Sequence, residues 1–276
     1  MGSRQNGLSG PVIGIAFDGT GYGTDGKIWG GEFLVAQMSK FERFAHFDYV
    51  PLPGGEVAIK EPWRMALSYL MYSFGDDFQS IEIPFVKFLN ENWSKVKILL
   101  KMIDRGINSP MTSAVGRLFD AVSAICSVSL RVNYEAQAAM EFQMLADEDE
   151  SGVYEFEIID SMKPWRISFK QGIRGIAHNI ESGIDVSKIA GKFHNTIARI
   201  VCEVAKKMKS ETGINDVVLS GGVFQNALLV NKTIIELEKA GFKVYTHSKV
   251  PPNDGGLSLG QAVVALFNAI LKFLFP

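Results

Sequence analysis

The sequence is poor in cysteine and has no excess of positive charge. Its two cysteines, Cys126 and Cys202, fall in apolar patterns typical of helices, which predicts buried thiols and neither a disulfide nor CxxC redox chemistry. Lys and Arg total 28 against 30 Asp and Glu, so no basic field would attract nucleic acid or anionic lipid. No apolar run reaches the roughly 18 residues that span a bilayer, and the N-terminus lacks an apolar signal segment. We therefore expect a cytoplasmic protein with no nucleic-acid or membrane partner.

Histidine is also scarce and carries no recognisable metal-binding motif. The four histidines, at positions 46, 178, 194 and 247, show no HxxxH or HxH spacing that would place two imidazoles on one metal ion. We interpret His194, which lies within a predicted helix, as a structural residue. The order of residues also gives no Ser/His/Asp triad and no nucleophile elbow.

What the sequence does contain is enough apolar material for a substantial core. Of its 276 residues 47% are hydrophobic. Residues 1–11 are interpreted as a tag or linker because the first strand is expected at 12–17. A glycine-rich turn at 18–23 and a second strand at 27–35 would complete a hairpin, and helical spacing then dominates to about residue 145.

The second half alternates strands and helices. An acidic stretch at 147–150 is the predicted boundary between a hairpin and helical region (12–146) and an α/β nucleotide-binding region (151–276). Alternation of this kind predicts an α/β fold with a mixed sheet flanked by helices. The expected strands are 154–159, 216–219 and 242–245, and the expected helices are 186–208, 224–240 and 257–271.

Three glycine-containing turns could carry chemistry. In the first, Asp18-Gly19-Thr20-Gly21, glycines would let backbone amides approach a phosphate and Asp18 could hold a metal ion. The alternative is an ordinary hairpin turn rich in Asp and Gly. In the second, Gly221, Gly222 and Asn226 join a buried strand to a helix, which directs amides at an anion; the alternative is a close-packed strand-to-helix turn.

The third turn places Asp254 before the last helix, where it could bind a metal ion or simply cap the helix. Two strand-end glycine turns and two such acids in an alternating chain form the parts of a phosphate and metal site. We therefore expect the three turns to converge on one cleft. Asp18 and Asp254 should approach closely enough to share a cation, with poor affinity because no histidine accompanies them.

Several separated motifs, in this order along the chain, resemble the C-terminal part of the carbamoyltransferase domain of HypF proteins, which act in hydrogenase maturation. The resemblance extends from about Val12 to Ala265. The motifs occupy residues 17–26, 29–33, 51–55, 61–66, 113–121, 133–139, 192–196, 220–226 and 251–261.

The resemblance implies an actin/sugar-kinase-like lobe with a helical insertion. It implies transfer of a carbamoyl group from carbamoyladenylate, formed with ATP, to the C-terminal cysteine of a HypE-like acceptor. A divalent metal, zinc or iron, is implied for the full-length protein. The implied roles are phosphate binding by Asp18, Gly19, Thr20 and Gly21, ribose binding by Gly116 and Asp120, adenosine binding by Gly221, Gly222 and Asn226, and metal binding by Asp18 and Asp254.

Two departures from the family pattern bear on these roles. The HxxxH element that supplies two metal ligands in the family would precede the first strand, so we expect the chain to be a fragment. Its missing N-terminal part would be a partner of this chain. We expect the chain alone to bind metal weakly or not at all and to carry out no carbamoyl transfer. Ala136 stands where the family pattern has glycine. The alternatives are an isolated, non-catalytic nucleotide-binding or HypE-docking module, and a kinase-like ATPase.

Overall fold

The computed structural model describes residues 7–8 and 10–274, and within them nine strands form one mixed sheet. The main path of the sheet has the order β6-β7-β3-β2-β1-β8-β9; the short strand β5 pairs with β2, and the short strand β4 pairs with β5. Strands from both sides of the acidic stretch at 147–150 therefore pair with one another. The strands are β1 (Val12–Tyr22), β2 (Ile28–Ala36), β3 (Phe41–Phe47), β4 (Val50–Pro51), β5 (Met111–Thr112), β6 (Glu157–Ile159), β7 (Trp165–Ser168), β8 (Asp216–Ser220) and β9 (Lys243–Tyr245).

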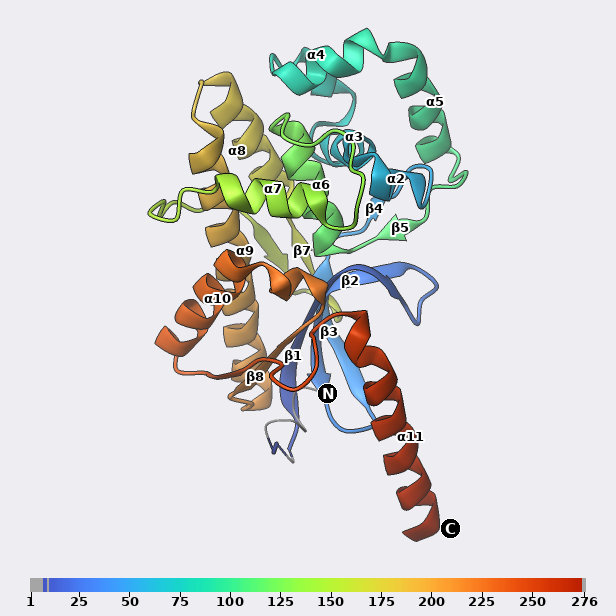
Figure 1. Cartoon of the computed structure of the whole chain (residues 1–276), viewed down its shortest axis with the longest axis vertical. Coiled ribbons are helices and arrows are strands. Elements are labelled where there is room, and N and C mark those ends of the chain that lie inside the picture. Colours follow the sequence, from blue (N-terminus) through green and yellow to red (C-terminus); the bar gives the residue numbers. More distant parts are fainter. Residues whose placement is uncertain (1–6, 9, 275–276) are drawn as a thin grey trace.

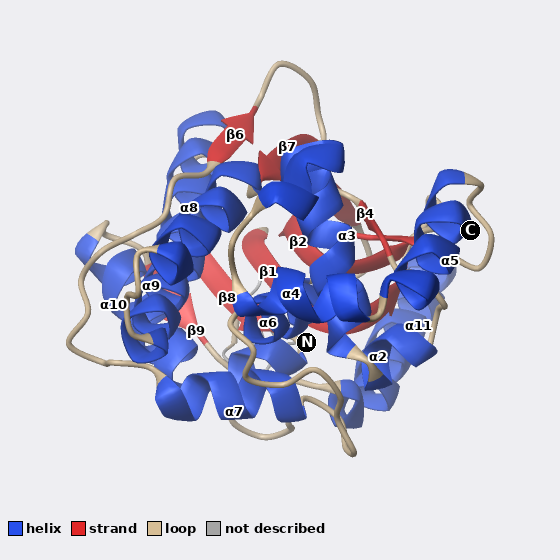
Figure 2. Ribbon diagram, turned by 90° about the horizontal axis from the view of Figure 1, so that it is seen from above, coloured by secondary structure: helices blue, strands red, loops and turns tan. Residues whose placement is uncertain are grey.

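Helices cover the sheet and extend above it (Figures 1 and 2). The α-helices are α2 (Val57–Lys60), α3 (Pro62–Phe74), α4 (Pro84–Glu91), α5 (Trp93–Asp104), α6 (Val115–Ile125), α7 (Gln137–Leu145), α8 (Lys170–Glu181), α9 (Val186–Thr212), α10 (Ala227–Lys239) and α11 (Leu257–Leu274). Three short 3₁₀ segments are η1 (Gly75–Ser80), η2 (Gly222–Gln225) and η3 (Asp254–Gly256). The predicted α/β class, with a mixed sheet flanked by helices, is confirmed.

The predicted hairpin forms, but its turn lies later in the chain than expected. β1 continues to Tyr22, so Asp18 and Gly19 belong to a strand, and the register against β2 shifts between Phe17 and Gly21. The chain reverses at residues 23–27, where the Gly23 amide donates to the Lys27 carbonyl at 2.9 Å. The prediction of a tight turn at 18–23 was therefore wrong, because the glycines allow an irregular strand at a place where they also favour a turn.

The parallel part of the sheet follows the sequence closely. β8 pairs with β1 in parallel, with Ala16 opposite Ser220, and β9 extends this arrangement. Ile13 and Ile15 are fully buried on one side of β1, whereas the alternate residues Gly14 and Ala16 are only half-buried. This alternation leaves one face of the central strands partly open beside the site.

Other predicted elements differ from the structure at their ends. The strand expected at 154–159 is confined to Glu157–Ile159. α6 ends at Ile125, so Cys126 caps a helix that was expected to continue, although its thiol is buried as predicted. β3, β7 and α8 were not predicted. Among the described helices none combines the length and apolarity needed to cross a bilayer.

Candidate functional site

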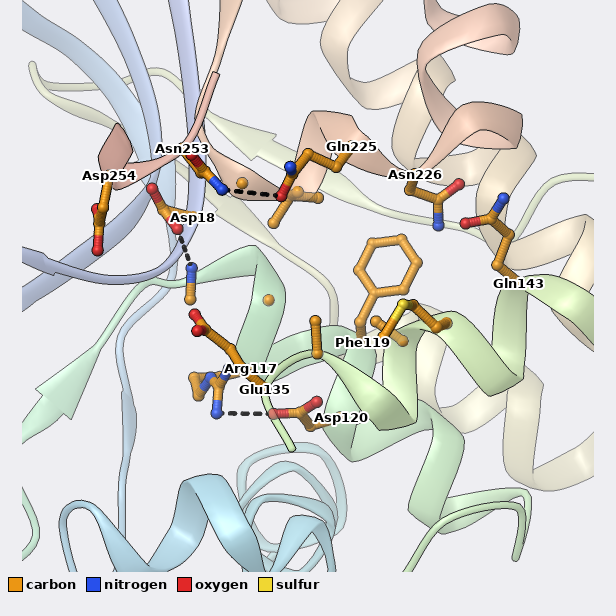
Figure 3. Close-up of a pocket in the computed structure, with 17 residues that line it drawn as sticks. Asp18, Arg117, Phe119, Asp120, Glu135, Gln143, Gln225, Asn226, Asn253 and Asp254 are labelled. Carbon is orange, nitrogen blue, oxygen red and sulfur yellow. Dashed lines mark hydrogen bonds and ion pairs between the residues drawn. The ribbon is translucent and has the colours of Figure 1, made fainter. Parts of the chain in front are cut away.

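The three predicted turns meet at one cavity of about 330 Å³, shown in Figure 3. Asp18 and Gly19 reach it from β1, Gly222 from η2, Asn226 from the start of α10 and Asp254 from η3. The other lining residues come from α6, α7, η2 and the residues just before α7 and η3: Gly116, Arg117, Phe119, Asp120, Glu135, Ala136, Ala139, Met140, Gln143, Val223, Gln225 and Asn253. The volume lies within the range of about 300–1,000 Å³ that is usual for small-molecule sites.

The parallel pairing of β1 and β8 explains why two of the turns meet. Because the strands run in the same direction, Asp18 and Gly222 both follow the carboxyl ends of the paired segments, where ligands of α/β proteins collect. The third turn is tied to the second by a backbone hydrogen bond in which the Gly221 amide donates to the Pro252 carbonyl at 3.0 Å. The predicted convergence is therefore confirmed.

Glycine at two positions allows this close approach. A Cβ added to Gly116 would lie 2.8 Å from the Cα of Gly19, so the first turn of α6 packs directly against β1. A Cβ added to Gly30, whose φ is +151°, would lie 2.6 Å from the carbonyl oxygen of Asp18. The bare backbone of β1 at Asp18 is thus held between β2 and α6.

Asp18 is a carboxylate of this cavity with a raised pKa. Burial raises its pKa, and the negative charges of Asp254 and Glu135 add to the rise; the Gly19 and Gly222 amides oppose it. The Gly19 amide donates to Oδ1 of Asp18 at 2.8 Å. Among the described residues Asp18 forms no ion pair, and the negative charges of Asp254 and Glu135 act on it, so this end of the cavity is suited to a positive ion.

Asp18 and Asp254 also line a second, more open cavity of about 680 Å³ that extends towards α11. They are therefore accessible from two sides. Across the described residues, no group of three or more His, Cys, Asp and Glu side chains could hold a metal ion. A metal ion bound here would therefore find two carboxylates among the described residues, those of Asp18 and Asp254.

Asp120 lies at the floor of the cavity, paired with an arginine. Its Oδ2 is 2.8 Å from Nη1 of Arg117, and both side chains are almost completely buried. Burial raises the pKa of Asp120, and the neighbouring guanidinium opposes that rise. The two atoms lack hydrogen-bond alignment, so Oδ2 of Asp120 and Nη1 of Arg117 form an ion pair but are buried without a hydrogen-bond partner among the described residues.

The opposite end of the cavity is mainly apolar, and of its lining only Asn226 was predicted from the sequence. Phe119 from α6 and Ala139 and Met140 from α7 line it, together with the carboxamides of Gln143 and Asn226 (Figure 3). Phe119 lies within the motif that contains Gly116 and Asp120, so its neighbourhood offered a signal. The α7 residues carried none, because alanine and methionine at helical spacing are typical of any helix.

The residue before α7 explains the departure from the family pattern. Ala136 adopts φ +60° and ψ +9°, the left-handed conformation that glycine reaches without a steric penalty. The family's glycine therefore matches the backbone that this chain forms with alanine. Ala136 and Glu135 both remain part of the cavity wall.

Three predicted residues lie outside this cavity. Gly21 and Gly221 line the second cavity instead. Thr20 is exposed and belongs to the lining of neither cavity. The structure therefore brings seven of the predicted residues to this cavity: Asp18, Gly19, Gly116, Asp120, Gly222, Asn226 and Asp254.

Comparisons with known proteins relate most of this chain to one family. Residues 14–261 match the family model described as "Carbamoyltransferase, Kae1-like Domain, second subdomain". The chain is 36% identical over 268 residues to the carbamoyltransferase HypF of Synechocystis sp., an alignment that covers 92% of this chain and 34% of that relative. The chain spans about a third of the length of the curated relatives it matches first.

Two solved structures have the same fold. A crystal structure of full-length HypF in the phosphate- and nucleotide-bound form aligns with a TM-score of 0.89 at 46% identity, covering 98% of this chain and 41% of that chain. The crystal structure of T. kodakarensis HypF aligns with a TM-score of 0.81 at 32% identity, covering 95% of this chain and 34% of that chain.

Proposed function

Because the chain belongs to the HypF carbamoyltransferase family and matches the second subdomain of its Kae1-like domain, we propose that its cavity of about 330 Å³ holds the adenylate of carbamoyladenylate during carbamoyl transfer. The observation that carries this proposal is the meeting of three glycine-containing segments around one cavity with an acidic end and an apolar end. The apolar end, with Phe119 and Met140, suits a base, and the acidic end suits a phosphate accompanied by a cation.

We propose the reaction itself for the whole protein. In this proposal the present chain forms one wall of the site. The thiolate of an acceptor cysteine attacks the carbamoyl carbon, a C–S bond forms, the bond from that carbon to the phosphate oxygen breaks, and AMP leaves. We propose the C-terminal cysteine of a HypE-like protein as the acceptor. A related full-length HypF has been crystallised with phosphate and nucleotide, which supports a nucleotide as the ligand of this cavity.

The family also implies a divalent metal, zinc or iron, and the residues present fit part of its ligand set. Asp18 and Asp254 would hold it. Burial and repulsion from neighbouring carboxylates disfavour the charged form of Asp18, and a bound cation would offset both effects. The metal would supply positive charge where negative charge develops during transfer. Because the described residues provide no third ligand of the usual types, we propose that the remaining ligands come from outside them.

Calorimetric titration of this chain with AMP, with and without Zn²⁺, tests the proposal. We expect AMP to bind, and we expect zinc alone to bind weakly, because two carboxylates are about half of a usual four-ligand set.

Asp254→Asn should abolish the zinc signal. It should also lower the pKa of Asp18, because it removes a repulsive neighbouring charge, and carbon NMR of the carboxylates would follow that change. The same replacement at the exposed Asp104 is the control. Absence of AMP binding would contradict the nucleotide assignment, and tight zinc binding unaffected by Asp254→Asn would contradict the metal assignment.

A further inference from the structure

We infer that His194 is a positioning residue for the nucleotide site: it fixes the carboxamide of Asn226 so that one amide hydrogen faces the cavity as a donor to a ring nitrogen of adenine. This inference rests on the proposed function, because it names the contact that would recognise the base. His194 is fully buried in α9 and does not itself line the cavity, whereas Asn226 does.

The hydrogen bond at one side of the imidazole defines its tautomer. Nδ1 of His194 lies 2.7 Å from the carbonyl oxygen of Ala190, one turn earlier in α9. A carbonyl oxygen can only accept, so Nδ1 carries the hydrogen. Burial also lowers the pKa of His194 to about 4, which keeps the ring neutral near pH 7. Nε2 is consequently an acceptor with a free lone pair.

This acceptor determines the orientation of the Asn226 carboxamide. Nδ2 of Asn226 lies 2.9 Å from Nε2 of His194 and donates one of its two hydrogens to it. Oδ1 of the same amide accepts from the Leu229 amide at 2.8 Å, capping the first turn of α10. Both ends of the carboxamide are therefore assigned, and the alternative flipped orientation would place an oxygen against a lone pair.

The second hydrogen of Nδ2 has no acceptor among the hydrogen bonds of the described residues. In Figure 3 the amide nitrogen of Asn226 points into the cavity, between Phe119 and Gln143. An amide hydrogen in this place requires an acceptor, and the ring nitrogens of adenine at positions 1, 3 and 7 are acceptors of this kind. Asn226 is half-buried, so a base that covers this donor without accepting from it would cost about 1–3 kcal/mol, and the contact favours a correctly placed base.

Aromatic packing prevents the imidazole from turning away. The ring of Phe119 meets it edge-on with centroids 5.3 Å apart, and the ring of Phe142 stacks on it at 6.1 Å with an interplanar angle of 24°. Phe119 contacts His194 and also lines the cavity. The histidine, its amide partner and the apolar end of the cavity thus form one packed unit.

Nitrogen NMR of the nucleotide-free chain tests the orientation without any ligand. We expect a neutral His194 with hydrogen on Nδ1. For Asn226 we expect one side-chain NH that is protected from exchange by its bond to Nε2 and one that exchanges faster because it faces the cavity. In His194→Gln that protection should persist, because a glutamine can donate to Ala190 and accept from Asn226, whereas in His194→Leu both hydrogens should exchange fast. A charged ring, hydrogen on Nε2, or unchanged Asn226 signals in His194→Leu would overturn the inference.

Binding of AMP and its 1-deaza, 3-deaza and 7-deaza analogues tests the consequence for recognition. We expect one analogue to bind about tenfold more weakly than AMP, the size of one lost hydrogen bond. His194→Leu should remove that discrimination and His194→Gln should keep it. Equal affinity of all four nucleotides for the unsubstituted chain would overturn the inference. Failure of AMP itself to bind would instead contradict the proposed function, and the NMR result would still decide the role of His194.

Discussion

Replacing Ala139 by tryptophan is expected to abolish measurable AMP binding, with a loss of affinity of at least about 100-fold, or about 2.7 kcal/mol. Ala139 is half-buried on α7, and it lines the apolar end of a cavity of only about 330 Å³. An indole there would occupy the volume that we assign to the base. Isothermal titration calorimetry on the folded variant gives the affinity directly.

Met144→Trp is the matched control for that substitution. Met144 lies on the same helix, is 85% exposed and does not line the cavity, so a tryptophan there should leave AMP affinity unchanged. If Ala139→Trp bound AMP as tightly as the unsubstituted chain, the nucleotide would have to lie elsewhere. The second cavity beside α11 would then be the next candidate.

Gly221→Ala is expected to lower the free energy of unfolding by about 4 kcal/mol or more. Gly221 has φ +100°, and an added Cβ would lie 2.0 Å from the carbonyl oxygen of Phe17 in the neighbouring strand. The substitution therefore combines backbone strain with a steric clash against β1, effects worth about 1–3 kcal/mol each. Urea unfolding followed by tryptophan fluorescence measures the loss.

Gly213→Ala separates these two effects. Gly213 has φ +70° at the C-terminus of α9, but nothing lies within 4 Å of an added Cβ. Only the cost of the left-handed conformation, about 1–2 kcal/mol, should remain. Equal destabilisation by the two substitutions would mean that β1 and the turn after β8 are not packed as closely as the structure has them.

Some strands and helices could be predicted because their sequence signals lie within one short segment of the chain, whereas others depend on pairing with distant strands. β8 and α10 could be predicted because a buried apolar run ends at two glycines and an amphipathic pattern follows. The turn of the first hairpin was misplaced because Asp18 and its glycines fit a bulged strand as well as a turn, and pairing with β2 decides between them. β3 was missed because four consecutive residues, 44–47, are buried, so no alternating pattern marks it as a strand.

The candidate site was predictable only in part, because some of its residues are marked by local sequence patterns and others are brought together only by packing. Asp18, Gly222 and Asp254 stand in glycine-containing segments that are visible in the sequence. The wall formed by α7 is produced by packing of distant segments, and Met140 or Gln143 alone indicates nothing about a ligand. The Asn226 to His194 hydrogen bond joins residues 32 positions apart, and sequence spacing cannot show such a contact.

Photolabelling with 8-azido-AMP followed by peptide mapping tests the central claim most directly, because it reports where the base lies. The account predicts that the label is carried by Phe119 or by residues 135–145, that excess AMP prevents labelling, and that Ala139→Trp removes it. Labelling confined to helices remote from this cavity, such as α4 and α5, and still suppressed by AMP, would contradict the assignment of the cavity as the nucleotide site.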